Sequence, residues 1–409
     1  MKKIIASAVG LMLAGGVAAT TASAVESQFG GYWRTRMFVQ SDFTGQDNSD
    51  FSRTDNRTRL YYTAKFNDDF KFVNKFEFNS NWGDTNGGDI GADGDTFRVK
   101  NSYADFTLGM ANIKLGIQGA RIARGFLFDD DFSGAVVTGK FGAVTVPVLY
   151  AMVDSEDVNP ETTTNTVVAA GTPPVPTVAT TTTGVTGDTH LISVMPSFNA
   201  GDAVKVTPHV TYLTTTSEDT DIYWLGVDAD AKFDAFSAWG TFIYNGGELM
   251  GDDISGFLVA AGADAGIVHG QAFYASGDDD AADNDIDAFL STPGQSYYWS
   301  EIMGLGTFDN RASAGSPGDD PTNIWAVNAG VTVKPMDKLT FDFDVWYAQL
   351  AEEVANEDEL GIEFDAKLTY AIYDNLKAEF VFAYLLAGDA TGGGDEDPME
   401  AGVRISLGF

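Results

Sequence analysis

The sequence contains no cysteine, which excludes disulfide bonds, thiolate metal sites and thiol nucleophiles. It also excludes a covalently attached c-type haem, because the C-x-x-C-H attachment motif needs two cysteines. A chain of 409 residues without these cross-links must be held together by packing and hydrogen bonds.

Long apolar runs are scarce as well, and the clearest one lies at the N-terminus. Residues 4–19 follow two lysines and precede an Ala-Ser-Ala site that ends at Ala24. This pattern predicts a secretory signal peptide, residues 1–24, cleaved after Ala24. The apolar run is shorter than the roughly 20 residues of a membrane-spanning helix. We therefore expect residues 25–409 to leave the cytoplasm.

Basic residues are few. Loss of Lys2 and Lys3 with the signal peptide leaves 22 basic residues against 59 acidic ones, a net charge of −37. Nucleic acid is excluded as a partner, because binding to phosphates needs a basic surface. The basic residues are also unevenly placed, since fourteen of the 22 lie between Arg34 and Lys140.

Strict alternation of apolar and polar residues is the main pattern that is present. The last nine residues, AGVRISLGF, place Val403, Ile405, Leu407 and Phe409 on one side of an extended strand. Stretches of about ten residues with the same alternation recur along the chain. Such strands fit either a soluble β-sandwich or a membrane barrel whose apolar face lies outside.

The connections favour the barrel, because short links alternate with long acidic ones. Outer-membrane barrels combine short periplasmic turns with long external loops. We predict an all-β transmembrane antiparallel barrel of about 18 strands, including 133–140 and 358–372, with 16 as the alternative count. Both termini then lie in the periplasm, and the last strand pairs with the first, around 29–41. External loops are expected near 83–95, 121–133, 154–187, 277–321 and 389–397, of which 155–187 and 277–321 have the composition of mobile loops.

Two stretches carry a family resemblance. VKNSYADF (99–106) with IKLGIQGARIARGFLFDDDFSGA (113–135) resembles the homotrimeric outer-membrane porins of sulfate- and metal-reducing bacteria. Residues 360–390 resemble the C-terminal strand pair of alginate-export-type porins. The resemblance implies a passive, water-filled, trimeric channel. It also implies that Phe409 is the assembly signal read by the barrel-assembly machinery.

Charged residues of lumen parity are the candidate site. Basic residues recur at i and i+2 opposite apolar partners, which directs them to the bore, while acids of lumen parity gather on late strands. Facing walls of opposite charge would make a transverse field that selects charged or dipolar solutes, although simple solvation of these residues explains their placement as well. The predicted basic patch is Arg34, Arg36, Arg57, Arg59, Lys71, Lys75, Arg98 and Lys100, and the predicted acidic wall is Asp342, Asp344, Glu363 and Asp365.

The link 121–133 is a predicted constriction loop. Phe126 and Phe128 are too apolar for a loop in water. We expect the loop to fold into the barrel and to turn its acids toward the arginine patch; the alternative is packing against a neighbouring subunit. Its candidate residues are Arg121, Arg124, Phe126, Phe128, Asp129, Asp130 and Asp131.

Evidence for other chemistry is weak. Asp84, Asp89, Asp93 and Asp95 lie in a Gly-rich stretch that suits calcium but lacks the EF-hand spacing, so a solvated acidic loop is preferred. The three histidines show no nucleophile–base pattern, so neither an enzyme nor a cofactor is predicted.

We therefore predict an outer-membrane porin for small hydrophilic solutes and ions, in contact with lipid and lipopolysaccharide. The alternatives are a channel specific for an anionic saccharide or carboxylate, and a sheath for an extracellular electron-transfer partner. A soluble exported β-protein is the remaining possibility.

Overall fold

The computed structural model describes residues 25–43, 50–85, 88–90, 97–155, 187–216, 220–280, 283–309, 320–391 and 396–409. The predicted signal peptide, Asp93, Asp95 and most of the predicted loop 154–187 lie outside these ranges. No helix in the described ranges is long and apolar enough to cross a membrane.

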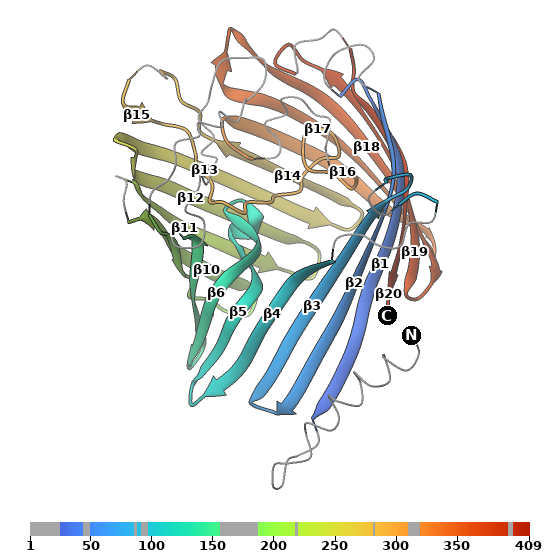
Figure 1. Ribbon diagram of the computed structural model, residues 1–409. Coiled ribbons are helices and arrows are strands. Elements are labelled where there is room, and N and C mark those ends of the chain that lie inside the picture. The colour runs from blue at the N-terminus through green and yellow to red at the C-terminus, as the bar shows by residue number, and fades with distance from the viewer. Residues whose placement is uncertain are drawn as a thin grey trace.

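The described chain is a β-barrel with one short 3-10 turn (Figure 1). The elements are β1 (Glu26–Ser41), β2 (Phe51–Asn67), β3 (Phe70–Asn81), β4 (Phe97–Leu108), β5 (Ala111–Ile122), η1 (Ala123–Gly125), β6 (Phe128–Phe141), β7 (Val144–Asp154), β8 (Thr189–Val194), β9 (Phe198–Asn199), β10 (Val204–Thr215), β11 (Thr220–Lys232), β12 (Ser237–Leu249), β13 (Asp252–Ala265), β14 (Val268–Ala275), β15 (Asp285–Ile286), β16 (Ile324–Met336), β17 (Leu339–Val354), β18 (Glu357–Tyr373), β19 (Leu376–Ala387) and β20 (Met399–Gly408).

Eighteen of these strands form the wall, as the sequence predicted. β8 and β9 both pair with β10 and are two pieces of one wall strand. β14 pairs with residues 258–265 of β13, and β15 pairs in parallel with Asp253 and Ile254 of the same strand. β15 is therefore not counted as a wall strand. Consecutive wall strands pair antiparallel, and β1 pairs with both β2 and β20. The predicted pairing of the last strand with the first is confirmed, so the sheet has no free edge.

Alternation along each strand separates the two faces of the wall. On β19, Phe380 and Phe382 are exposed on the outside, whereas Val381 between them is buried in the interior. On β17, Phe343 pairs with Val331 and Ala366 on the outer face, and Asp342 and Asp344 point inward. The apolar stripe therefore faces the surroundings rather than a second sheet, which is the arrangement of a membrane barrel.

Two segments leave the wall and fill part of the interior. The first, which we call the inserted hairpin, comprises residues 118–132 from the ends of β5 and β6 with η1 between them (Figure 1). β4 pairs with β5 only as far as Ile117, and β6 pairs with β7 only from Ser133. Beyond these points β5 and β6 pair only with each other. Phe126 is 0% exposed and packs on Phe273 of β14, so the hairpin lies against the inner wall.

For the second, we use the name inserted loop for residues 283–309, which the structure describes within the connection between β14 and β16. The sequence predicted a mobile external loop here, and for these residues that prediction was wrong. Phe308 is buried and stacks on Phe38 of β1, which faces inward. Trp224 Nε1 on β11 donates to Leu290 O at 2.6 Å. The loop's aromatic and aliphatic residues thus find partners on the inner wall, which its acidic flanks do not reveal.

The two inserted segments also contact each other. Tyr297 of the loop stacks on Phe126 of the hairpin, with ring centroids 3.6 Å apart. Asp129 N donates to Gly294 O at 2.9 Å. Together they form a dry apolar mass on one side of the interior and leave a polar space on the other.

Candidate channel and constriction

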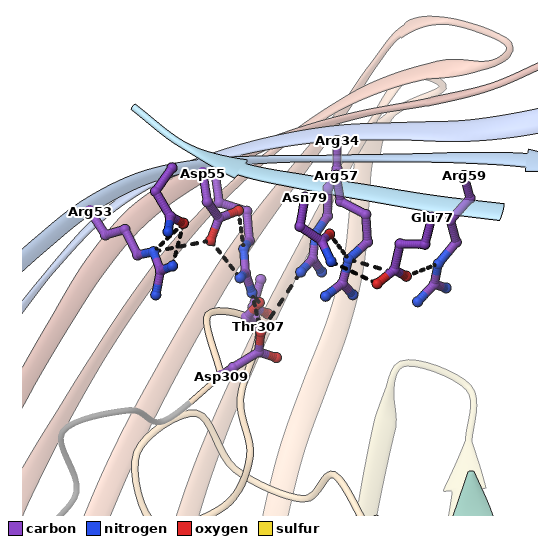
Figure 2. Close-up of polar contacts among 11 residues, drawn as sticks. Arg34, Arg53, Asp55, Arg57, Arg59, Glu77, Asn79, Thr307 and Asp309 are labelled. Carbon is purple, nitrogen blue, oxygen red and sulfur yellow. Dashed lines mark hydrogen bonds and ion pairs between the residues drawn. The ribbon is translucent and has the colours of Figure 1, made fainter. Parts of the chain in front are cut away.

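We call four members of the predicted basic patch, Arg34, Arg36, Arg57 and Arg59, the arginine patch. They lie on the inner face of β1 and β2. Arg34 pairs directly with Arg57 in the strand register, and Arg36 pairs with Asp55. Arg53, which the sequence analysis did not single out, continues the same row on β2. Figure 2 shows these side chains projecting from the wall toward the interior, with Asp309 of the inserted loop reaching them from the opposite direction.

Most of the patch is already paired with acids on neighbouring strands. Arg36 holds Asp55 with two hydrogen bonds, Nε to Oδ1 at 3.0 Å and Nη2 to Oδ2 at 2.6 Å. Glu77 on β3 accepts from Arg59 Nε at 2.7 Å and lies 3.5 Å from Arg57 Nε. The strand pairing brings these charges together, because Asp55 and Glu77 share lumen parity with the arginines. That parity is visible in the sequence, and applying it to the acids of β2 and β3 would have found both partners.

Asp309 is the contact that no local pattern predicts. Its Oδ2 lies 2.8 Å from Arg36 Nη1 and 3.7 Å from Arg34 Nη2. Arg36 Nη1 also donates to Thr307 O at 3.1 Å. Thr307 and Asp309 of the inserted loop therefore both contact the arginine patch.

The outer members of the predicted patch are more scattered. Lys71 Nζ lies 3.2 Å from Asp105, and Lys75 Nζ lies 5.3 Å from the ring centre of Tyr61. Arg98 is exposed and sits opposite Glu77 in the register. Lys100 lies at a bulge in β4 and pairs with Asp131 of the inserted hairpin.

The predicted acidic wall divides into two kinds of residue. Asp342 accepts from Thr332, and Asp344 lies 2.8 Å from His269 Nε2 and 3.0 Å from Asn328 Nδ2. Both line the polar space.

Glu363 is different, and the prediction that it lines the pore was wrong. It is 0% exposed and accepts hydrogen bonds from the backbone N–H groups of Ile302 at 2.7 Å and Met303 at 2.8 Å. Asp365 beside it is largely buried and accepts from Glu301 N, although it still borders the space. A turn of the inserted loop covers both carboxylates, so their role is to hold that loop.

The inserted hairpin narrows the bore through Arg124. Ala123, Arg124 and Gly125 have φ values of 49°, 59° and 96°, a left-handed turn that is costly for the first two residues. This turn carries Arg124 across the interior, where Nη2 meets Asp230 Oδ1 of β11 at 2.5 Å. The guanidinium also lies 4.7 Å from the ring centre of Trp239 on β12.

The hairpin acids do not form the predicted face toward Arg34 and its neighbours. Asp129 lies 3.2 Å from Arg121 of the same hairpin, and Asp130 Oδ1 accepts from Asp131 N. Asp131 contacts Lys100 and Asn101 of β4. Phe128 packs against Phe132 and is buried. Of the inserted segments, it is the inserted loop that brings an acid, Asp309, to Arg34 and Arg36.

The polar space is a cavity of about 550 Å³ between the inserted loop and the wall. Its basic lining residues are Arg34, Arg57, Lys367 and Arg404, and its acidic ones are Asp264, Glu301, Asp309, Asp342, Asp344 and Asp365. A second cavity of about 310 Å³ lies by the short turn at 200–203 and includes Lys205 and Asp230. Trp239 lines both cavities, and Arg124 lies against its ring.

Trp239 depends on a glycine for its position. A Cβ at Gly262 of β13 would lie 2.5 Å from Trp239 Nε1, so the indole rests directly on that backbone. Neither residue was singled out from the sequence, since one tryptophan of lumen parity has no local signature of a constriction.

The C-terminal residue lies on the outer face, as its parity predicts. Phe409 exchanges backbone hydrogen bonds with Gly31 of β1. A Cβ at Gly31 would lie 2.4 Å from Phe409 Cζ, so the ring covers this glycine. No cluster of three His, Cys, Asp or Glu residues in the described ranges is arranged to hold a metal, and Asp93 and Asp95 of the calcium suggestion lie outside these ranges.

Comparison with solved structures shows the fold class. OccK9 (OpdG) of Pseudomonas aeruginosa superposes with a TM-score of 0.64 at 13% identity, over 94% of this chain and 99% of that chain. OpdQ of the same organism gives 0.62 at 14% identity, over 94% and 99%. OpdK with vanillate gives 0.59 at 13% identity, over 94% and 98%. OpdK is described as an outer membrane protein.

The chain therefore has the fold of an 18-stranded outer-membrane β-barrel. No family model and no curated protein matches its sequence. At these identities the structural likeness concerns the fold alone, and the resemblance to porins of sulfate- and metal-reducing bacteria stays a prediction.

Proposed function

We propose that this protein is an outer-membrane channel through which small hydrophilic solutes diffuse passively. The observation that carries the proposal is the charged cavity of about 550 Å³ inside a barrel whose outer face is apolar. A soluble protein would bury its apolar face and expose its charges, and here the arrangement is reversed. A hydrophilic solute can cross the hydrocarbon of a membrane only through a polar interior that is wide enough for water.

The charges suggest selection as well as passage. Arg34 and Arg57 lie on the β1–β2 side of the cavity, and Asp264, Asp342 and Asp344 lie on β13 and β17. Fixed charges of opposite sign on different walls favour solutes that carry charge or a strong dipole. Because six acids and four basic residues line the cavity, a general preference for anions does not follow from charge count.

A carboxylate-specific channel is the second candidate. OpdK has been crystallised with vanillate, a carboxylate, and shares this fold. In the present chain the Arg34–Arg36 pair already holds one carboxylate, that of Asp309, inside the bore. Guanidinium groups are well suited to carboxylates because their N–H donors match the two oxygens.

The sheath hypothesis is less favoured. A barrel that encloses an electron-transfer partner needs a wide interior, whereas here the chain's own hairpin and loop occupy much of that space. Catalysis is not proposed either. His190 contacts the Tyr150 hydroxyl and His269 contacts the Asp344 carboxylate, and neither contact joins a histidine to a serine.

For the surroundings of the barrel we propose the outer membrane of a Gram-negative cell, reached after cleavage following Ala24. We further propose recognition of Phe409 by the assembly machinery, contact of the acidic loops with lipopolysaccharide through divalent cations, and a homotrimer. Cross-linking of the protein extracted in mild detergent would show whether three copies associate.

Planar-bilayer recording with ion replacement tests the central proposal. We expect discrete conductance steps in sodium chloride and a measurable reversal potential across a salt gradient. Heat-denatured protein in the same detergent is the control. A folded, inserted barrel that passes neither ions nor small sugars into liposomes would rule the channel out.

A further inference from the structure

Asp309 occupies a position that an external carboxylate could also occupy. Its side chain is 42% exposed and borders the cavity, whereas Glu363 and Asp365 of the same region are covered. It reaches its arginines from the inserted loop rather than from a neighbouring strand (Figure 2). A group in this position can be replaced without disturbing the wall.

Arg34 shows that the position is incompletely filled. Arg34 is only 8% exposed, yet its Nε has no hydrogen-bond partner. Its contact with Asp309 is 3.7 Å, too long for a good hydrogen bond, while Asp309 lies 2.8 Å from Arg36. Asp309 is attached to the chain and lies closer to Arg36 than to Arg34, whereas a free carboxylate is not held in that position.

Arg36 has a separate partner for its other edge. Asp55 takes Nε and Nη2, which leaves Nη1 for Asp309 and Thr307 O. If Asp309 leaves, Arg36 keeps its bidentate ion pair with Asp55 and the hydrogen bond from Nη1 to Thr307 O, and it loses one acceptor, the Asp309 carboxylate. An incoming carboxylate supplies that acceptor, so the exchange does not leave a buried charge unpaired.

The rest of the inserted loop has its own attachments. Ile302 and Met303 are held by Glu363, and Phe308 by its stack on Phe38. These attachments do not involve the carboxylate of Asp309.

We propose that Asp309 is a tethered competitor in a monocarboxylate-binding site formed by Arg34 and Arg36, and that carboxylate solutes displace it as they pass. The inference rests on the proposed channel function and adds a site and a control to it. While Asp309 occupies the site, small anions bind there weakly. A carboxylate that contacts both arginines displaces Asp309 from the site.

The test compares sodium acetate with sodium chloride in single-channel recordings. Acetate is the probe because it has the charge and the head group of an aspartate side chain. In Asp309→Asn the competitor is removed, so we expect the half-saturating acetate concentration to fall roughly tenfold, the scale of one charge-assisted hydrogen bond. The value for chloride should change much less, because chloride cannot bridge two guanidinium groups with two oxygens.

Asp264→Asn is the matched control, since it removes one negative charge from the same cavity away from Arg34 and Arg36. It should shift acetate and chloride alike. An Asp309→Asn effect that is also equal for both anions would mean simple electrostatics and would overturn the proposal. Channels that conduct normally but show no acetate effect would overturn it too, while leaving the channel function intact.

A second variant uses the absence of native cysteine. Asp309→Cys can be modified in an already inserted channel, so folding of the variant is assessed before the reagent is added. A negatively charged methanethiosulfonate should restore the weak acetate binding of the native protein, and a positively charged one should not. Equal effects of the two reagents would contradict the proposal.

Discussion

Arg124 of the inserted hairpin binds Asp230 on β11, with Nη2 and Oδ1 2.5 Å apart, and lies against Trp239 on β12. This contact joins the inserted hairpin to two strands of the wall, β11 and β12. Trp239 lines both cavities of the interior, and Asp230 lines the smaller one. The narrowest polar passage is therefore expected here, rather than at the row of hairpin aspartates.

Truncation of Trp239 tests that location. Trp239→Ala should raise single-channel conductance, because removal of the indole joins the cavities of about 550 and 310 Å³. Trp325→Ala is the control, since Trp325 packs on Tyr347 on the outer face and should leave conductance unchanged. Equal conductance of the native protein and Trp239→Ala would place the constriction elsewhere.

Packing of the inserted hairpin gives a stability prediction. Phe126 is fully buried between Phe273 and Tyr297, so Phe126→Ala should lower the free energy of unfolding by about 3–5 kcal/mol. Urea titration in lipid vesicles, followed by tryptophan fluorescence, measures this change. Phe126→Leu keeps most of the volume and should cost less than about 1.5 kcal/mol. If the alanine variant were as stable as the leucine one, the hairpin would not be packed as described.

Attachment of the inserted loop gives a dynamic prediction. Glu363→Ala leaves the N–H groups of Ile302 and Met303 without their acceptor, at a cost of about 1–3 kcal/mol for each buried donor. Hydrogen exchange of the peptide that contains these residues should accelerate, while peptides from the wall strands should not change. Glu363→Gln keeps an acceptor oxygen and should show a smaller effect. Unchanged exchange in both variants would show that other contacts suffice to hold the loop.

Closure of the barrel gives an assembly prediction. Gly31→Val places a side chain where the Phe409 ring and Arg59 O now lie, 2.4 and 2.7 Å from the position of a Cβ. We expect displacement of Phe409, a loss of about 1–3 kcal/mol and slower assembly, measured as the fraction with heat-modifiable mobility over time. Gly408→Ala is the control, because nothing lies within 4 Å of its Cβ position. Similar assembly of both variants would argue against a close Gly31–Phe409 contact.

The wall of this protein was largely predictable from the sequence. The predicted strand 358–372 is observed as Glu357–Tyr373, and the inward and outward parity of the β1 and β17 charges is as expected. The strand predicted at 133–140 begins earlier, at Phe128, because β5 and β6 keep pairing after they leave the wall. A period of two is a local property of extended chain, so neighbouring residues suffice to reveal it.

The sequence by itself determined the alternation, an approximate strand count and the parity of the charges on strands such as β1, β2 and β17. Only the tertiary structure decided that residues 283–309 turn inward, that Glu363 is covered, and that Asp309 meets Arg34 and Arg36. Asp309 and Arg36, for example, are 273 positions apart in the chain. Such contacts depend on which surfaces of a closed barrel face each other, and that relation is absent from any short stretch of sequence.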